Sequence, residues 1–478
     1  PWRDWVINAF NANMPFDQFT IEQLAGDLLP NAGDSQKTAT GFHRNTMINQ
    51  EGGIDQEEFR IEAVLDRVNT TGTVFLGLTI GCVQCHEHKY DPIAHEEYYE
   101  LFAFFNNDDE VNLDFPTDAQ AKRIAEINGE IKPIKEEWDA YLKEAHDSHQ
   151  IEWEKGITKE DVKTLFLDKQ EAILKPREER SPEEQKIVDE YFKEKDEKSR
   201  EFKKRIDELN SKKPDVVSTM VLRQRKEPRV TNVFIQGDFT RKGEAVQPGV
   251  LDVLNDMEPV EKPTRLDLAK WIVDPDNPLT ARVTVNRFWQ RFFGKGIVET
   301  ENDFGSQGTP PTHPELLDWL AVEFIENGWS MKSIQRLIAT SATYRQSSNT
   351  REELKEIDPK NELLARQNRI RLDAEVIRDS ALAAAGVLNR KLKGPSVFPP
   401  LPDGVMDLGQ KKRDWNADTG ADRYRRGLYT FFWRATPHSF LMTFDAPNAM
   451  GTCTRRVRSN TPLQALTLLN DQAFVEMA

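Results

Sequence analysis

Cysteine is scarce in this chain, with 3 residues among 478. So few thiols exclude a disulfide framework as the source of stability. The sequence also lacks a run of 18 or more apolar residues, so no transmembrane segment is expected in it. A P-loop, a G-x-G-x-x-G fingerprint and a Ser-His-Asp order are absent too. The sequence therefore lacks the commonest signatures of nucleotide-binding proteins and of serine hydrolases.

Positive charge is under-represented, because 64 Lys and Arg stand against 80 Asp and Glu and leave a net charge of −16. This balance argues against a nucleic-acid partner. A chain of this length is expected to fold into several domains, and its 26 Phe and 10 Trp are sufficient for real cores. The chain starts at Pro1 without a signal peptide and ends within a helix-like segment, so we interpret it as truncated at both ends.

Two of the three cysteines stand in one motif, Cys82-Val83-Gln84-Cys85-His86. The C-x-x-C-H pattern is typical of covalent attachment of a c-type haem. Two thiols one turn apart can each add to a vinyl group of the porphyrin, and the adjoining His can place its imidazole under the iron. We therefore predict haem c as the cofactor, attached to Cys82 and Cys85, with His86 as the proximal iron ligand.

The sixth iron ligand is less constrained by the sequence. Met47 is a candidate because thioether ligation raises the reduction potential, and His43 is a second candidate. His88 lies too close to His86 in sequence to reach the opposite face of the iron. Core packing would account for Met47, and a hydrogen-bonded turn for His43, without any metal. An open sixth position would favour ligand binding or catalysis over simple electron transfer.

Zinc is the alternative cofactor. Cys82 and Cys85 with His86 or His88 and with His95 would supply a Cys2His2 set, although His88 and His95 are more widely spaced than in usual zinc sites. A reversible dithiol is the third interpretation, in which His86 would lower the pKa of a neighbouring thiol.

Composition divides the chain into four parts. Residues 1–115 form a helical module that carries the motif, with Asp55 expected to cap a helix. Residues 116–214 are highly charged, and their sparse apolar residues predict a helical hairpin or a solvated spacer. Residues 215–260 form a small β region, and residues 261–478 form a second helical module. The predicted fold is mainly α: a multi-domain helical protein with a small β insertion and a charged helical arm.

Some finer features follow from local patterns. Two β-rich runs, at 216–222 and 230–235, flank a turn at Lys226-Glu227-Pro228. Pro314 is expected in the first turn of a helix, residues 331–341 form another, and residues 360–390 read as one long helix.

The second helical module carries polar and aromatic residues near predicted helix ends, and such groups can line a carbohydrate or partner groove. The alternative is structural: Trp289 and Trp319 would be core residues, and Arg287 would pair with Asp303 or Asp318. The residues in question are Asn286, Arg287, Trp289, Asp303, His313 and Asp318.

Longer motifs span both modules. The first module contains WVINAFN at 5–11, EQLAGD at 22–27, FHRNTM at 42–47, EGG at 51–53 and GLTIGCVQCHEHKYDP at 77–92. The second contains NPLTAR at 277–282, VNRFW at 285–289, DFG at 303–305, HPELLDW at 313–319, SATYRQS at 341–347 and RSNTPLQAL at 458–466. With these motifs the chain resembles the planctomycete cytochrome-c-like proteins that pair a PSCyt module with a PSD module. The resemblance covers nearly all of the chain outside the charged segment. It implies an export signal in full-length relatives, and the cytochrome name of the family rests on the C-x-x-C-H pattern itself.

From the motif and the resemblance we expect a c-type haem protein that transfers single electrons in a periplasmic, cell-surface or secreted location. A redox partner protein is expected, and the second module would bind a partner or a polysaccharide. One alternative is a non-redox, zinc-stabilised binding or scaffold protein of the cell surface. Another is a glycan-processing enzyme, for which the sequence offers no identified acid/base pair.

Overall fold

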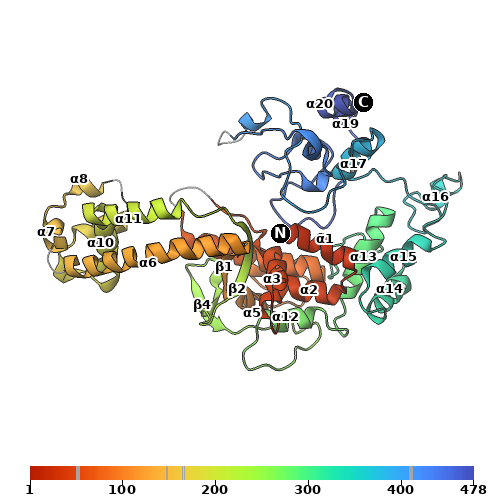
Figure 1. The fold of residues 1–478 in the computed structure, drawn as a ribbon. Coiled ribbons are helices and arrows are strands. Elements are labelled where there is room, and N and C mark those ends of the chain that lie inside the picture. The colour runs from red at the N-terminus through yellow and green to blue at the C-terminus, as the bar shows by residue number, and fades with distance from the viewer. Residues whose placement is uncertain (50–53, 147–148, 164, 166, 409–412) are drawn as a thin grey trace. The chain divides into compact units, whose positions relative to one another are not determined.

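The computed structural model describes residues 1–49, 54–146, 149–163, 165, 167–408 and 413–478 (Figure 1). The EGG motif at 51–53 lies outside these residues. Two compact units are present: unit 1 comprises Pro1–Leu113 and Thr219–Ala478, and unit 2 comprises Asp114–Ser218. Helices dominate, and the strands of the described residues form two two-stranded sheets, which confirms the predicted mainly α class. Within the same residues, no helix combines the length and apolar character that crossing a membrane requires.

The first part of unit 1 is a set of packed helices. Asp55 begins α4, where its carboxylate accepts hydrogen bonds from the backbone N–H of Glu57 (2.8 Å) and Glu58 (3.3 Å), which confirms the expected cap. The helix then passes into a π-helical turn, Gly72–Leu76, and stops at Gly77, whose φ of 61° suits glycine. The helices are α1 (Trp2–Ala12), α2 (Phe16–Ala25), α3 (Asp34–Ala39), α4 (Gln56–Thr71) and α5 (His95–Asn106), with 3-10 turns at Gly26–Leu28, Thr40–Arg44 and Ile80–Gln84.

The four strands of the described residues form two separate pairs, each made of consecutive strands. The strands are β1 (Asp108–Phe115), β2 (Val217–Gln224), β3 (Thr231–Phe234) and β4 (Lys242–Val246). β1 pairs with β2, and β3 pairs antiparallel with β4. The turn at Lys226-Glu227-Pro228 therefore connects strands of different sheets and does not close a hairpin. The sequence prediction missed β1 because DDEVNLDF is acidic and its partner follows about a hundred residues later, after unit 2.

The second helical part of unit 1 begins with α12. The expected helices at Pro314 and Met331 are confirmed, but the expected long helix over 360–390 is wrong, since only α17 is helical there. Asp358 accepts hydrogen bonds from the backbone N–H groups of Glu362 and Leu363, and this local bonding competes with a helix. The helices are α12 (Arg265–Ile272), α13 (Thr280–Phe293), α14 (Pro314–Glu326), α15 (Met331–Thr340), α16 (Leu354–Ile357), α17 (Ala374–Ala384), α18 (Ser439–Thr443), α19 (Pro462–Asn470) and α20 (Gln472–Met477), with 3-10 turns at Ile235–Gly237, Val405–Leu408, Gly420–Tyr424 and Gly427–Tyr429.

One hydrophobic core joins the two helical parts of unit 1. Leu268 and Ile272 of α12 are buried in one cluster with residues of the N-terminal helices. These residues are Val68 of α4, Leu76 of the π-helical turn and Leu101 of α5. A second core forms among α13, α14 and α15 around Trp289 and Phe324. Because α12 is buried among the N-terminal helices, the second part cannot separate from the first without exposing a shared core.

Arg265 is the most deeply buried charge at this junction, with 0 % exposure. Its guanidinium donates to the Asp108 carboxylate (2.8 Å), to both oxygens of Asp27 (2.9 and 3.0 Å) and to the carbonyl of Leu24 (2.6 Å). Burial opposes its charge, but Asp108 and Asp27 together raise the pKa of Arg265. Arg265 therefore stays charged and holds the end of α2 and the start of β1 against α12.

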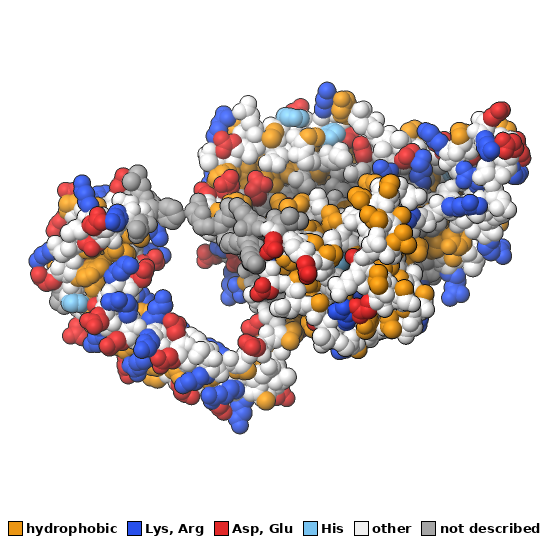
Figure 2. All heavy atoms as spheres, turned by 90° about the horizontal axis from the view of Figure 1, so that it is seen from above, with side chains coloured by type: hydrophobic (Ala, Val, Ile, Leu, Met, Phe, Trp, Pro, Cys, Tyr) orange, Lys and Arg blue, Asp and Glu red, His pale blue; other side chains and the backbone are white. Residues whose placement is uncertain are grey.

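Unit 2 is built on a helical hairpin. α6 and α11 lie side by side (Figure 1), with Ile127, Ile131 and Ile134 of α6 buried against Phe202 and Ile206 of α11. Acidic and basic side chains alternate over the surface of this unit (Figure 2). Its helices are α6 (Asp118–His146), α7 (His149–Lys155), α8 (Lys159–Val162), α9 (Leu167–Leu174), α10 (Pro182–Lys195) and α11 (Glu197–Asn210), with a 3-10 turn at Arg177–Glu179.

Replacing Arg265 is expected to destabilise unit 1 strongly. Arg265→Met leaves two buried carboxylates without their cation, a change that costs about 3–5 kcal/mol when one partner of a buried ion pair is removed. The control is Arg282→Ala, which removes an exposed ion pair to Asp318 (2.7 Å) and is expected to cost at most about 1 kcal/mol. Urea unfolding followed by circular dichroism measures both. Equal midpoints for the two variants would contradict the role of Arg265.

Asp108 is expected to make stability fall with rising pH. Burial raises the pKa of Asp108 to about 6, against the attraction of Arg265, whereas an unfolded Asp titrates near 4. Between pH 4 and pH 6 the Asp108 carboxyl is protonated in the folded state and ionised in the unfolded state. The resulting contribution to the free energy of unfolding is therefore present at low pH and is lost as the pH rises towards 6. Asp108→Asn should flatten this decline in urea midpoints measured from pH 4 to 7.

Asp109 is the matched control for that measurement. Against the effect of its own burial, hydrogen bonds and charge from Arg225 lower the pKa of Asp109, so its contribution is lost as the pH falls. Asp109→Asn should therefore leave the decline between pH 4 and 6 in place. A decline that persists in Asp108→Asn would show that another group causes it.

Candidate functional site

The C-x-x-C-H motif lies on the 3-10 turn Ile80–Gln84 and the residues that follow it, between α4 and α5. Ile80 and Val83 are buried at 1 % and 0 % exposure and anchor the turn in the core. Cys82, Cys85 and His86 are exposed, and both cysteines are free thiols. The fold therefore fixes the backbone of the motif while its three reactive side chains face outwards.

The His86 ring is held in one tautomer by a local contact. Its Nδ1 lies 2.7 Å from the carbonyl oxygen of Glu87. A carbonyl oxygen only accepts hydrogen bonds, so Nδ1 carries the proton and Nε2 keeps its lone pair. Metal-ligating histidines commonly use this arrangement, in which one ring nitrogen donates to a carbonyl and the other is free for the metal.

The two thiols differ in their surroundings. Gly237, with φ 77°, lies so close to Cys85 that a Cβ at that position would stand 2.7 Å from its Sγ, so a glycine is required there. Burial raises the pKa of Cys82, and the charges of Asp91 and Cys85 raise it further. The expectation that His86 lowers the pKa of the thiols is therefore wrong for Cys82, and a weakly ionised thiol does not suit a redox-active dithiol.

His88 and Asp91 close the loop that follows the motif. His88 Nδ1 accepts a hydrogen bond from the Asp91 backbone N–H (2.7 Å), and both side chains are buried. The Asp91 carboxylate in turn accepts from the backbone N–H (2.6 Å) and the hydroxyl (2.5 Å) of Ser306. Gly305 leaves no space for a side chain beside Asp91. The 303–306 loop of the second module thus holds the loop of the motif, a role for Ser306 that sequence reasoning missed.

His95 is engaged in the fold as well. Its Nε2 and the Tyr99 hydroxyl both contact the carbonyl oxygen of Gln84, at 3.0 and 2.8 Å. Among the described residues, no three His, Cys, Asp or Glu side chains gather as a metal-ion site. The structure therefore does not bring together the four residues named for zinc.

His43 and Met47 line a different cavity, of about 250 Å³, which we name the seam cavity; its lining includes Trp2, His43, Met47, Asp66, Arg434 and Met450. Cys82, Cys85 and His86 are not among its lining residues. His43 is buried at 2 % exposure, whereas Met47 is 61 % exposed, so the interpretation of Met47 as core packing is wrong. Burial lowers the pKa of His43 well below its usual range, with Arg67 and Arg265 adding to the effect, so its imidazole is neutral. Iron ligation by either residue stays a prediction.

Most polar residues singled out in the second module hold backbone segments. Asn286 donates to the Val298 carbonyl (3.0 Å) and accepts from its N–H (2.9 Å). The Arg287 guanidinium donates to the carbonyls of Thr73 and Val74 in the π-helical turn that follows α4, and burial lowers its pKa to about 10.

Two expectations about this module are corrected by these contacts. Arg287 does not pair with Asp303 or Asp318, because Asp318 pairs with Arg282 and Asp303 accepts from the Gly305 N–H. Trp289 is a core residue as expected, but Trp319 is 47 % exposed. His313 precedes α14 at its N-cap position. These side chains therefore act as structural links and do not line a groove together.

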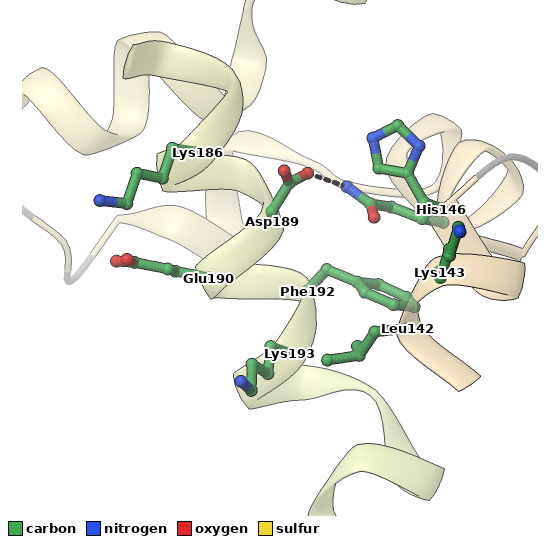
Figure 3. Close-up of a pocket in the computed structure, with 9 residues that line it drawn as sticks. Leu142, Lys143, His146, Lys186, Asp189, Glu190, Phe192 and Lys193 are labelled. Carbon is green, nitrogen blue, oxygen red and sulfur yellow. Dashed lines mark hydrogen bonds between the residues drawn. The ribbon is translucent and has the colours of Figure 1, made fainter. Parts of the chain in front are cut away.

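Unit 2 contains a larger cavity, of about 410 Å³ (Figure 3). Leu142 and Phe192 form its apolar floor, and the Gln150 amide donates to Asp189 at 2.7 Å. Lys143, Lys186, Lys193 and His146 line it together with the carboxylates Asp189 and Glu190. Its volume exceeds that of the seam cavity. We take the motif as the candidate site because it presents two exposed thiols and an exposed imidazole on a turn that the core holds.

Two family models match parts of the chain. Residues 1–110 match PSCyt2, a protein of unknown function (DUF1549), and residues 264–478 match PSD1, a protein of unknown function (DUF1553). The chain carries a PSCyt2 module and a PSD1 module. No curated protein and no solved structure matches it. The PSCyt2 module contains the C-x-x-C-H motif, and the PSD1 module contains Arg265, Arg287 and Ser306, so these three residues connect the two modules.

The raised pKa of Cys82 predicts slow alkylation at neutral pH. In a Cys85→Ala/Cys453→Ala background, the rate of iodoacetamide reaction should keep rising above pH 9, because only the thiolate reacts. Asp91→Asn removes one negative charge that raises the pKa and should shift the profile to lower pH. A rate that levels off below pH 8 in the unchanged Asp91 background would contradict the assignment.

Proposed function

We propose that this protein binds haem c covalently and transfers single electrons. Cys82 and Cys85 would carry the two thioether bonds, and His86 would bind the iron through Nε2. The observation that supports this proposal best is the His86 tautomer, because Nδ1 donates to the Glu87 carbonyl and leaves Nε2 free beside two exposed thiols. When bound, haem supplies a one-electron Fe(III)/Fe(II) couple.

Attachment needs only groups that the motif provides. Each thiol would add its S–H across one vinyl C=C bond, with sulfur bonding to one vinyl carbon and hydrogen to the other. The addition consumes no further oxidant or reductant. Cys82 and Cys85 are free and exposed, as this step requires. The neighbouring Ile80 and Val83 are buried, so the turn is held while its sulfur atoms react.

Several contacts favour haem over zinc. A tetrahedral zinc site needs four ligand atoms about 2.0–2.3 Å from the metal. His88 already accepts the Asp91 N–H, and His95 already contacts the Gln84 carbonyl. Recruiting His88 or His95 to a zinc ion would break a contact that holds the loop. Haem would need His86 as its only ligand from these three histidines.

The PSD1 module would position the motif in this function. Its Phe304 N–H donates to the Gly77 carbonyl (2.8 Å) ahead of the motif, and Ser306 binds Asp91 after it. The motif loop is therefore fixed at both ends by one loop of the second module. Because thioether attachment takes place outside the cytoplasm, the proposal includes a periplasmic, cell-surface or secreted location and a redox partner protein. Polysaccharide binding by the PSD1 module is no part of it, because the polar residues considered for such a groove hold backbone segments.

Expression of the full chain in a periplasm with haem-maturation machinery tests the proposal. Intact mass should increase by one haem, and the reduced protein should show sharp α and β absorption bands. Cys82→Ala and Cys85→Ala should each lose one thioether, and the double variant should lose covalent haem. Cys453→Ala is the matched control, because this third cysteine lies outside the motif and its loss should leave the haem in place.

Two results would overturn the haem assignment. An unchanged mass with stoichiometric zinc would identify a structural metal site, and a mass lower by two hydrogens would identify a disulfide. In haem-loaded protein, Met47→Leu and His43→Gln then test the sixth ligand by the visible spectrum. A spectrum unchanged in both variants assigns the sixth position to neither residue.

A further inference from the structure

The seam cavity belongs to both modules. Trp2, His43 and Asp66 come from the PSCyt2 module, and Arg434 and Met450 come from the PSD1 module. The hydroxyls of Thr70 and Thr452, one from each module, hydrogen-bond to each other at 2.7 Å within its lining. Neither module alone would form this site.

Two buried polar atoms of the lining have no hydrogen-bond partner among the residues that the structure describes. These atoms are His43 Nε2 and Trp2 Nε1, which are shielded from solvent, and His43 is 2 % exposed. Leaving such an atom unsatisfied costs about 1–3 kcal/mol, so folded proteins usually satisfy it. The indole N–H can only donate, so the oxygen of a ligand hydroxyl group or of a water molecule would satisfy it.

The charged groups of the lining select against ions. Arg434 donates to the carbonyls of Asn45 and Thr46, and Arg67 Nε donates to the carbonyl of His43 (3.0 Å). Asp66 accepts no hydrogen bond from the described residues, and burial raises its pKa against the charges of Arg67 and Arg434. An anion would meet Asp66 and a cation would meet the two guanidinium groups, whereas a hydroxyl group can donate to Asp66 and accept from Trp2.

The volume of the seam cavity and its apolar lining further restrict the class of ligand that fits it. The cavity volume of about 250 Å³ lies below the range of about 300–1,000 Å³ that drug-sized ligands occupy. Trp2, Phe42, Met47 and Met450 offer apolar surface for the C–H groups of a small ring. We infer that the seam cavity binds a neutral polyhydroxylated ligand of monosaccharide size, in contact with Asp66, Trp2 and His43. This inference does not rest on haem attachment, since Cys82, Cys85 and His86 do not line the cavity.

Isothermal titration of the full chain with single sugars tests the inference. The probes are glucose, galactose, mannose, xylose and fucose, with sodium sulfate as the anion and ethanolamine as the cation. At least one sugar is expected to bind with a Kd below about 10 mM, a weak affinity within reach of a small pocket. Asp66→Asn removes the charged acceptor and should weaken that sugar at least tenfold. Trp2→Phe keeps the ring, removes the N–H donor and should weaken it several-fold.

Glu100→Gln is the matched control. Glu100 is a half-buried carboxylate of α5 whose pKa burial also raises, but it does not line the cavity. Its variant should bind the sugar unchanged. The inference is overturned if no sugar binds, if only sulfate or ethanolamine binds, or if Asp66→Asn and Trp2→Phe both retain wild-type affinity. Circular dichroism checks that each variant is folded. If Asp66→Asn does not fold, the affinity of Trp2→Phe for the sugar tests the inference by itself.

Discussion

The buried Arg265 guanidinium is the contact on which unit 1 depends. It holds Leu24 and Asp27 at the end of α2 and Asp108 at the start of β1, while Asp27 also accepts the backbone N–H of Gln224 in β2. Segments separated by up to 241 residues therefore meet at one cation. A buried ion group of this kind is stable only when complete, because each missing partner leaves a desolvated charge. The two modules consequently behave as one folding unit, and unit 2 is inserted between two strands, β1 and β2, that this group helps to fix.

The helices were predictable wherever one local signal determined them. The Asp55 cap, the Pro314 start and the apolar spacing of α15 are each contained in a few consecutive residues, and the structure has these helices. The pairing of β1 with β2 was not predictable, because an acidic strand has a weak β signal and its partner lies beyond unit 2. The stretch after Asp358 failed for another reason: its composition suits a helix, but side-chain bonds to nearby backbone groups are more favourable there.

At the candidate site, too, the sequence predicts only those features that a local pattern determines. The motif was visible in the sequence because its two cysteines and its histidine stand at fixed spacing within five residues. The carbonyl partners of Arg287 and Arg434 were not, since a backbone carbonyl is present at every residue and leaves no mark in the sequence. For this reason Arg287 was expected to pair with a carboxylate, although it holds the π-helical turn that follows α4. Ser306 escaped notice in the same way, because its partner Asp91 lies in the other module.

The motif and the seam cavity are connected through the last turns of α4. Asp66 and Thr70 are one turn apart and line the cavity, whereas Asn69 accepts a hydrogen bond from Tyr98 (3.1 Å) and lies beside Gly81, next to the motif. Arg287 binds two carbonyls of the π-helical turn that follows this helix. Tyr98, Thr452 and Arg287 therefore each hold the end of this segment by a hydrogen bond. A cofactor on the motif and a ligand in the cavity would thus act on neighbouring faces of one short segment. Coupling between two sites requires a shared element whose position both of them bias, and these turns of α4 are the element that borders both sites. Any such coupling would be reciprocal, so that a ligand that shifts the properties of the cofactor would bind with an affinity that depends on the state of the cofactor.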